Sequence, residues 1–175
     1  KVMTGVKVPR GAQLFSRPVS GTPCKFRTCY DTTLWPLTVS AAQWTTPDRL
    51  KPAIKASDAV AALRVELRCF PDVSLSKLAL DTVRLHLAGD ATVVYTLYEL
   101  MGANCVRVIA REPGGGAKAR SVVLSANALQ PAGFDDADGL LPYPRRSFVG
   151  YRMLQEYFTF PEKFLFFEMS GLGQL

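Results

Sequence analysis

Two short segments of this 175-residue sequence carry residue types that could do chemistry. Gly114-Gly-Gly-Ala-Lys118 has the glycines and the lysine of a phosphate-binding loop, but the Gly-Lys-Ser/Thr core is missing and no helix is expected to follow. Asp135-Asp136-Ala-Asp138-Gly139 is similar to a calcium loop. With Gly139 at the sixth position, however, Arg145 would occupy the twelfth, where calcium needs a bidentate glutamate. Neither segment predicts a bound metal or cofactor.

Histidine and cysteine chemistry is equally poorly supported. His86 is the only histidine, and it is expected on the polar face of a strand as a structural residue. No Cys-x-x-Cys spacing occurs, so the four cysteines predict buried, reduced thiols and no zinc site. The carboxylates are scattered and form no acid–base pair. The sequence therefore does not predict an enzyme.

A proline-framed loop carries a better candidate site. Pro142-Tyr-Pro-Arg-Arg146 places a tyrosine and two arginines directly before a predicted helix. Aromatic residues and arginine dominate the energetics of protein interfaces. In the alternative interpretation, the tyrosine packs over its own helix and the arginines are merely solvated; the two interpretations are balanced. The predicted contact residues are Tyr143, Arg145, Arg146, Tyr151 and Arg152.

The net charge of +6 is concentrated at the N-terminal end. The first thirty residues contain no Asp or Glu, whereas the other basic and acidic residues cancel. Because proline and glycine separate the basic residues and no cluster of stacking aromatics accompanies them, a solvated face or a protein-docking surface is favoured. A nucleic-acid- or carbohydrate-binding β-domain is the alternative. The basic residues are Lys1, Lys7, Arg10, Arg17, Lys25 and Arg27.

Most of the elements that must position these residues are predicted to be strands. Residues 62–70 and 82–88 alternate apolar and polar side chains, which is typical of an antiparallel sheet with one solvated face. Residues 105–111 and 120–125 flank a glycine-rich hairpin connection, and 7–16 and 25–41 are also extended. We predict an α+β fold dominated by antiparallel strands in two packed sheets.

Two helices are predicted, near 90–101 and 147–158. Asp90 and Ser147 are placed to cap them. Residues 148, 151, 154, 157 and 158 of the second helix are apolar or aromatic at the spacing of one face, so this face is expected in the core. After Pro161, residues 163–169 form a dense apolar run that predicts a strand buried on both faces, in the centre of a sheet.

Length and composition favour a single β-rich domain over residues 1–175. The sequence is 48% hydrophobic and 21% charged, which suits a folded domain with a core. A minor domain boundary is possible near 45–56, where prolines interrupt the pattern. No apolar run is long enough to span a membrane.

Three segments in the same order resemble one known family. The last, GYRMLQEYFTFPEKFLFFEMSGL, is aromatic-rich and specific; the others are GTPCKFRTCYDTTLWPL at 21–37 and LALDTVRLHLAGDATVVYTLYEL at 78–100. All three are similar to passages of the TssF (also ImpG or VasA) family, baseplate subunits of the bacterial type VI secretion system. Family members are longer, so the chain is expected to be an internal fragment.

The resemblance implies a structural role in a phage-tail-like contractile injection system. It implies a cytoplasmic wedge that joins a TssG-type subunit, TssK-type trimers and further TssF copies, on the cytoplasmic side of the secretion membrane complex. Six such wedges would surround the central spike and nucleate the contractile sheath. The same resemblance implies protein partners only, without nucleic acid, cofactor or membrane insertion.

Overall fold

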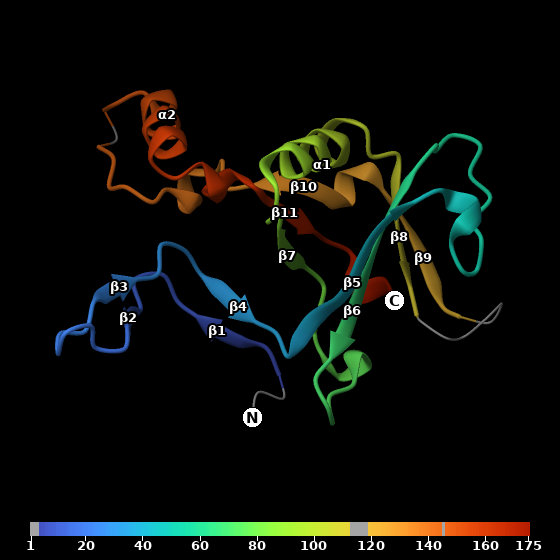
Figure 1. The fold of residues 1–175 in the computed structure, drawn as a ribbon, viewed down its shortest axis with the longest axis horizontal. Helices are drawn as coiled ribbons and strands as arrows, with labels where there is room; N and C mark the ends of the chain where they lie inside the picture. Colours follow the sequence, from blue (N-terminus) through green and yellow to red (C-terminus); the bar gives the residue numbers. More distant parts are fainter. Residues whose placement is uncertain (1–3, 113–118, 145) are drawn as a thin grey trace.

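A computed structural model describes residues 4–112, 119–144 and 146–175 (Figure 1). Strands dominate it, with two α-helices and several short 3₁₀ turns in the described ranges. The α+β prediction is therefore confirmed. In chain order the elements are β1 Val6–Val8, β2 Gln13–Phe15, β3 Lys25–Arg27, β4 Thr32–Leu34, β5 Leu37–Thr45, β6 Ala62–Cys69, β7 Val83–His86, α1 Ala91–Ala103, β8 Arg107–Arg111, β9 Ser121–Ser125, β10 Leu129–Ala132, α2 Val149–Thr159 and β11 Phe166–Met169.

The strands form several small antiparallel sheets in place of the two packed sheets that the sequence predicts. Four described pairs stand as two-stranded sheets: β1–β4, β2–β3, β5–β6 and β8–β9. Only β10–β11–β7 has three strands, with β11 in the centre. The extended stretches 7–16 and 25–41 are each divided into short strands, because turns at Pro9–Gly11, Cys29–Asp31 and Pro36 interrupt them. Short strands with frequent turns pair locally and cannot extend a large sheet.

The three-stranded sheet contains the best-buried aromatic side chain. Phe167 of β11 is fully buried, and its ring centroid lies 5.1 Å from that of Tyr98 on α1. Gly102 of α1 also faces this ring, since a Cβ added at Gly102 would lie 3.7 Å from the Cζ atom of Phe167. Helix α1 therefore covers one face of the sheet (Figure 1). The predicted central strand is confirmed, although it begins at Phe166 because residues Pro161–Phe164 form a 3₁₀ turn.

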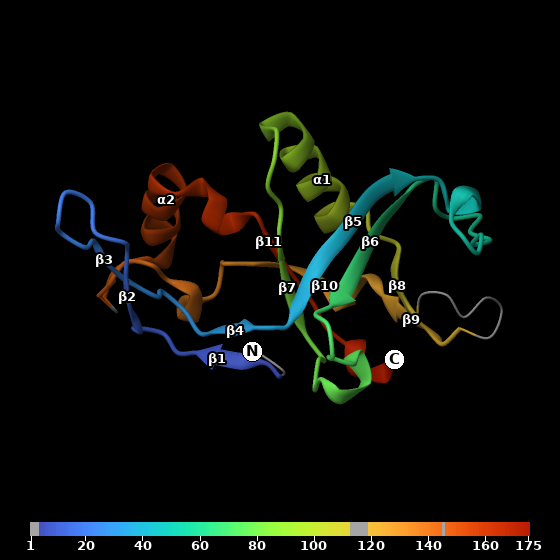
Figure 2. The same cartoon turned by 60° about the horizontal axis from the view of Figure 1, so that its bottom comes forward.

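A second apolar cluster joins the sheet to the N-terminal half. Leu78, Leu80 and Val83 are buried, and partly buried side chains including Trp35 and Leu37 pack against them. From Trp35 the chain leads back to strands β1 to β4, which form an extended N-terminal arm (residues 4–34) beside the rest of the molecule (Figure 2). The arm is thus anchored at its root by apolar packing.

The helix predictions are confirmed in position and corrected in detail. Asp90 caps α1, accepting hydrogen bonds from the N–H groups of Thr92 and Val93. For α2, Phe148 is the N-cap residue and makes no side-chain capping bond, so the assignment of Ser147 as the cap is wrong. A short strand, β10, lies in a region for which the sequence pattern predicts no strand. It contains Pro131, which a sheet tolerates on an edge strand such as this one.

The β8–β9 hairpin confirms the predicted pairing, with Arg107 opposite Ser125. Its predicted connection at 113–118, which includes the glycine-rich segment, lies outside the described residues. Within residues 45–56, Thr45 ends β5, and the rest forms a 3₁₀ turn at Pro47–Arg49 and irregular chain. The single domain with a minor boundary there stays a prediction.

The burial of Phe167 leads to a stability prediction. Phe167→Ala should lower the free energy of unfolding by about 3–5 kcal/mol, because it removes a fully buried ring and leaves a cavity. Phe158→Ala is the control, since Phe158 is 81% exposed and should change stability by less than about 0.5 kcal/mol. Urea unfolding followed by circular dichroism measures both. Equal stability of Phe167→Ala and the wild type would contradict the central position of β11.

Candidate protein interface

Helix α2 buries its charged side and exposes its aromatic side, the reverse of the sequence prediction. Arg152 and Glu156, one helical turn apart, are both buried. Lys163 in the following 3₁₀ turn is also buried, and its ammonium group contacts the Glu156 carboxylate. The predicted core face at 148, 151, 154, 157 and 158 instead faces solvent. The underside of α2 is therefore an ionic cluster.

Glu156 is the centre of this cluster. One of its carboxylate oxygens accepts hydrogen bonds from the backbone N–H groups of Leu140 (2.7 Å) and Leu141 (3.2 Å), while the other pairs with Lys163. Desolvation alone would raise the pKa of Glu156, but the bonds from Lys163, Leu141 and Leu140 outweigh it and lower the pKa below its ordinary value. The carboxylate is therefore ionised and ties α2 to the segment that precedes it.

Arg152 extends this tie to the acidic loop. Its guanidinium lies 3.4 Å from the Asp136 carboxylate, donates to the Asp135 carbonyl at 3.4 Å, and stands 3.9 Å from Glu156. Gly139 allows the close approach, since a Cβ there would lie 3.0 Å from an Arg152 nitrogen. The side chain is thus held inside and positions loop 135–141 against the helix.

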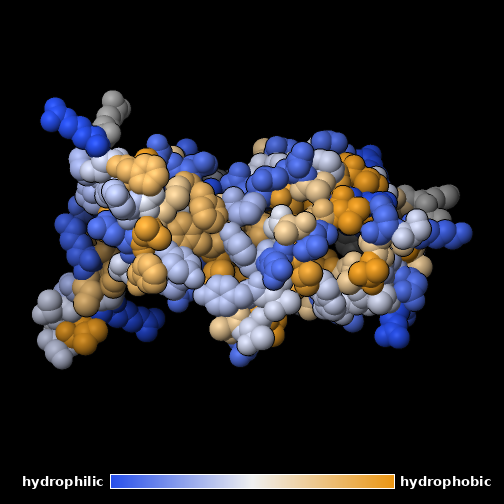
Figure 3. All heavy atoms as spheres, turned by 90° about the horizontal axis from the view of Figure 1, so that it is seen from above, coloured by the Kyte–Doolittle hydropathy of each residue, from blue (hydrophilic) through white to orange (hydrophobic). Residues whose placement is uncertain are grey.

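The outward side of α2 forms a continuous run of exposed apolar side chains. Phe158 and Phe148 are 81% and 71% exposed, and Tyr151 is 62% exposed. Figure 3, seen from above, shows apolar side chains gathered over α2 toward the left of the view. Exposed apolar surface of this density marks a protein-interaction site more often than a solvated face. We call Phe148, Tyr151, Leu154, Tyr157, Phe158 and Phe160 the α2 aromatic face.

Ring contacts order parts of this face before any partner binds. Phe148 and Tyr151 meet edge to face with centroids 5.6 Å apart, as do Tyr157 and Phe158 at 5.5 Å. Tyr157 also approaches the buried Phe164, at 6.1 Å. Side chains already held by such contacts lose less entropy on binding. The face is thus partly pre-organised.

The structure distributes the five predicted contact residues unequally. Tyr151 and Arg146 are exposed, and Tyr143 is partly buried. Arg145 lies outside the described residues. Arg152 is buried in the ionic cluster, so its side chain supports the surface from below and is not free to meet a partner. The structure places Tyr151 and Arg152 next to each other on α2, but Tyr151 is exposed and Arg152 is buried.

The other residues singled out by sequence also have structural roles. Asp138 is buried, accepts a hydrogen bond from the Gly133 N–H at 3.1 Å and pairs with Arg84 at 3.4 Å. His86 stacks on Phe166 with ring centroids 4.4 Å apart. All four cysteines are free, but Cys24 is exposed and the others are partly buried, so the prediction that they are buried is wrong. Within the described ranges, no group of three potential ligands could hold a metal.

Sequence patterns predicted no role for Glu156 or Lys163. Two signals were present: the spacing of Arg152 and Glu156 by one helical turn, and a lysine directly before the apolar run at 164–167. The aromatic residues on the opposite face gave the stronger periodic signal, and burial was therefore assigned to the wrong side.

No described helix is both long and apolar enough to cross a membrane.

Comparison with known proteins identifies the family of the chain that carries this surface. The family model described as type VI secretion system, TssF, matches residues 1–175. This chain belongs to the TssF family. The family resemblance of the three sequence segments is thereby confirmed over the whole chain.

Two similar proteins extend the comparison. The type VI secretion system component TssF1 of Pseudomonas aeruginosa is 39% identical over 98% of this chain. A chain in the cryo-electron microscopy structure of the type VI secretion system TssK-TssF-TssG baseplate subcomplex is 29% identical, with a TM-score of 0.77 over 100% of this chain. The present chain spans 28% and 31% of their lengths.

The ionic cluster predicts a pH-dependent stability. Since the folded-state pKa of Glu156 is lowered, its stabilisation is complete above the unfolded pKa of about 4.3 and is lost as pH falls through the folded value. Glu156→Gln should cost about 3–5 kcal/mol at neutral pH, because it leaves Lys163 buried without a counter-charge. Urea unfolding at neutral and acidic pH measures both effects.

The control for this prediction is Glu162→Gln, which neutralises an exposed carboxylate of the same turn and should leave stability nearly unchanged. Because Glu156→Gln has already lost the titrating group, its stability should fall less than that of the wild type between neutral and acidic pH. If the free energy of unfolding fell equally with pH in the wild type and in Glu156→Gln, the role of Glu156 would be contradicted.

Proposed function

We propose that this chain is part of a structural baseplate component of a bacterial type VI secretion system. Its role is assembly by protein–protein contact, not catalysis. The observation that carries the proposal is the match of the whole chain to a chain of a TssK-TssF-TssG baseplate subcomplex, at a TM-score of 0.77. The 39% identity to TssF1 of Pseudomonas aeruginosa supports it.

The partners in this proposal are a TssG-type subunit, TssK-type subunits and further TssF copies. In this role the protein acts in the cytoplasm, where the baseplate docks on the membrane complex. The spike and the contractile sheath are contacted indirectly, and the assembled baseplate nucleates the sheath.

The contact region in this proposal is the α2 aromatic face together with the loop before it. Tyr151 belongs to both the predicted contact set and the aromatic face, and Arg146, in the loop before α2, is also exposed. An apolar centre with arginine at its rim is the usual composition of a protein interface. The buried ionic cluster supports this region by holding α2 in one orientation.

Introducing a charge into the aromatic face tests the proposal. Phe158→Glu should weaken association with co-expressed TssG-type and TssK-type subunits at least tenfold, because a central aromatic anchor contributes about 2 kcal/mol or more. Val60→Glu is the control, since Val60 is 92% exposed but lies far from α2 in the chain. Co-purification and size-exclusion chromatography measure assembly. If Phe158→Glu formed normal complexes, the aromatic face would not be part of the interface.

Charge reversal in the preceding loop is a separate test. Replacing Arg145 and Arg146 by Glu should weaken co-purification with the TssG-type subunit or a neighbouring wedge, because arginine pairs with carboxylates or stacks on aromatics at such sites. Thermal stability should stay nearly unchanged, since exposed charges contribute little to folding. Normal assembly and secretion would exclude this loop, although not the protein, from the baseplate contacts.

A further inference from the structure

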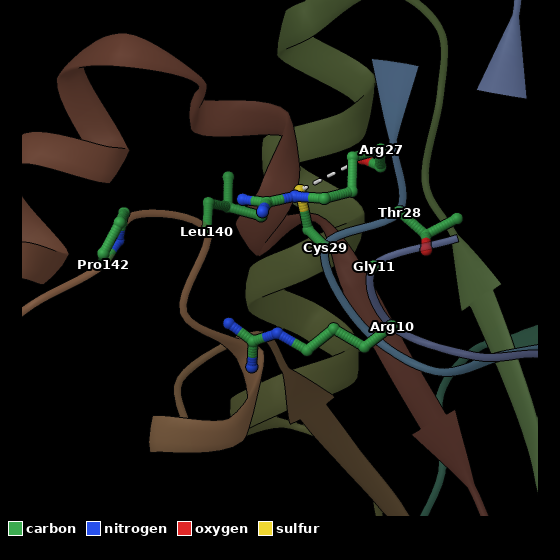
Figure 4. A pocket seen from close by; sticks show the side chains of 7 residues that line it. All are labelled: Arg10, Gly11, Arg27, Thr28, Cys29, Leu140 and Pro142. Carbon is green, nitrogen blue, oxygen red and sulfur yellow. Dashed lines mark hydrogen bonds between the residues drawn. The ribbon is translucent and has the colours of Figure 1, made fainter. Parts of the chain in front are cut away.

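A small pocket lies where the N-terminal arm meets the loop that precedes α2. Its volume is about 260 Å³, and Arg10, Gly11, Arg27 and Thr28 line it from the arm. Leu140 and Pro142 line it from the loop. The side chains of Arg10 and Arg27 both extend toward that loop (Figure 4). The pocket thus combines segments more than one hundred residues apart in sequence.

The two arginines differ in what they already bind. Arg10 is fixed, because its guanidinium donates to the carbonyls of Ala137 and Gly139, each at 2.8 Å. These acceptors are neutral, so they orient the group without cancelling its charge. The nearest arm carboxylate, Asp31, accepts a bond from the Arg10 backbone N–H and is paired with Lys7 at 2.8 Å. The Arg27 side chain forms no hydrogen bond or ion pair with the described residues.

The lining indicates which chemistry would fill the pocket. Its described residues include no carboxylate, and the arm around it is basic. Guanidinium groups bind carboxylates through paired, charge-assisted hydrogen bonds. The walls formed by Leu140 and Pro142 are apolar and suit the methylene groups of a side chain. The volume matches one or two side chains and not a folded ligand.

We propose that this pocket binds an aspartate or glutamate side chain presented by an extended segment of a partner protein. Arg27 forms the new ion pair, and the anchored Arg10 adds a fixed positive charge beside it. This proposal does not depend on the baseplate role, because it follows from the pocket and its charge. A nucleic-acid strand would need an open basic groove with stacking aromatics, whereas this site is a hollow of side-chain size.

Peptide binding to the purified protein tests the proposal. The probe is a fluorescein-labelled peptide of alternating glutamate and leucine, measured by fluorescence anisotropy at low and high salt. Arg27→Gln should weaken its binding about tenfold, since a charge-assisted hydrogen-bonded pair is lost. Arg17→Gln is the matched control: it removes the same charge from the exposed turn of the same hairpin, outside the pocket lining. Thermal melting confirms that both variants are folded.

The remaining probes decide between the pocket and a general basic surface. A glutamine–leucine peptide of the same length should bind at least tenfold more weakly than the acidic peptide. Equal weakening by Arg27→Gln and Arg17→Gln would overturn the proposal, as would equal binding of the two peptides or no binding of either. Tighter binding of single-stranded oligothymidine than of the acidic peptide would also overturn it, and would favour a nucleic-acid surface.

Discussion

The buried contact between Glu156 and Lys163 is the interaction on which the C-terminal half depends. It joins α2 to the 3₁₀ turn that leads into β11, and the same carboxylate holds the backbone at Leu140 and Leu141. A buried charge without a partner costs several kcal/mol, so only one rotation of the helix satisfies this cluster. That rotation turns the aromatic face outward. The exposed surface is therefore a consequence of the charges beneath it.

Loop 135–141 receives contacts from several neighbouring parts of the molecule. Arg10 reaches it from the arm, Arg84 from β7 and Arg152 from α2. Hydrogen bonds from these arginines to backbone carbonyls and to Asp138 fix it in place. The acidic residues that resemble a calcium loop in the sequence thus act as acceptors for arginine. Arginine suits this use, because its planar group donates in several fixed directions.

Local patterns predicted much of the fold but not the orientation of α2. The strand at 62–69, the Asp90 cap and the central strand β11 each depend on neighbouring residues, and all three were predicted correctly, although Val65 is 38% exposed where the alternation predicts an inward side chain. The division into small sheets depends on turns whose combined effect a pattern of single strands does not reveal. The outward aromatic face depends on Lys163, which lies beyond the helix, and no periodicity within 147–158 contains that information. The pocket at Arg27 joins residues distant in sequence and carried no local signal.

Two of the attachments of the N-terminal arm differ in physical character. At its root Gly5 lies against the Trp35 ring, where a Cβ would come within 2.6 Å, and this apolar contact is continuous with the core. Further along, Arg10 is attached through two hydrogen bonds to carbonyls. A hydrogen bond breaks after a smaller displacement of its donor and acceptor than is needed to separate two packed apolar surfaces. Under a pulling force the hydrogen bonds of Arg10 would therefore break before the apolar contact at Trp35, so the arm would loosen from loop 135–141 while its root stayed attached.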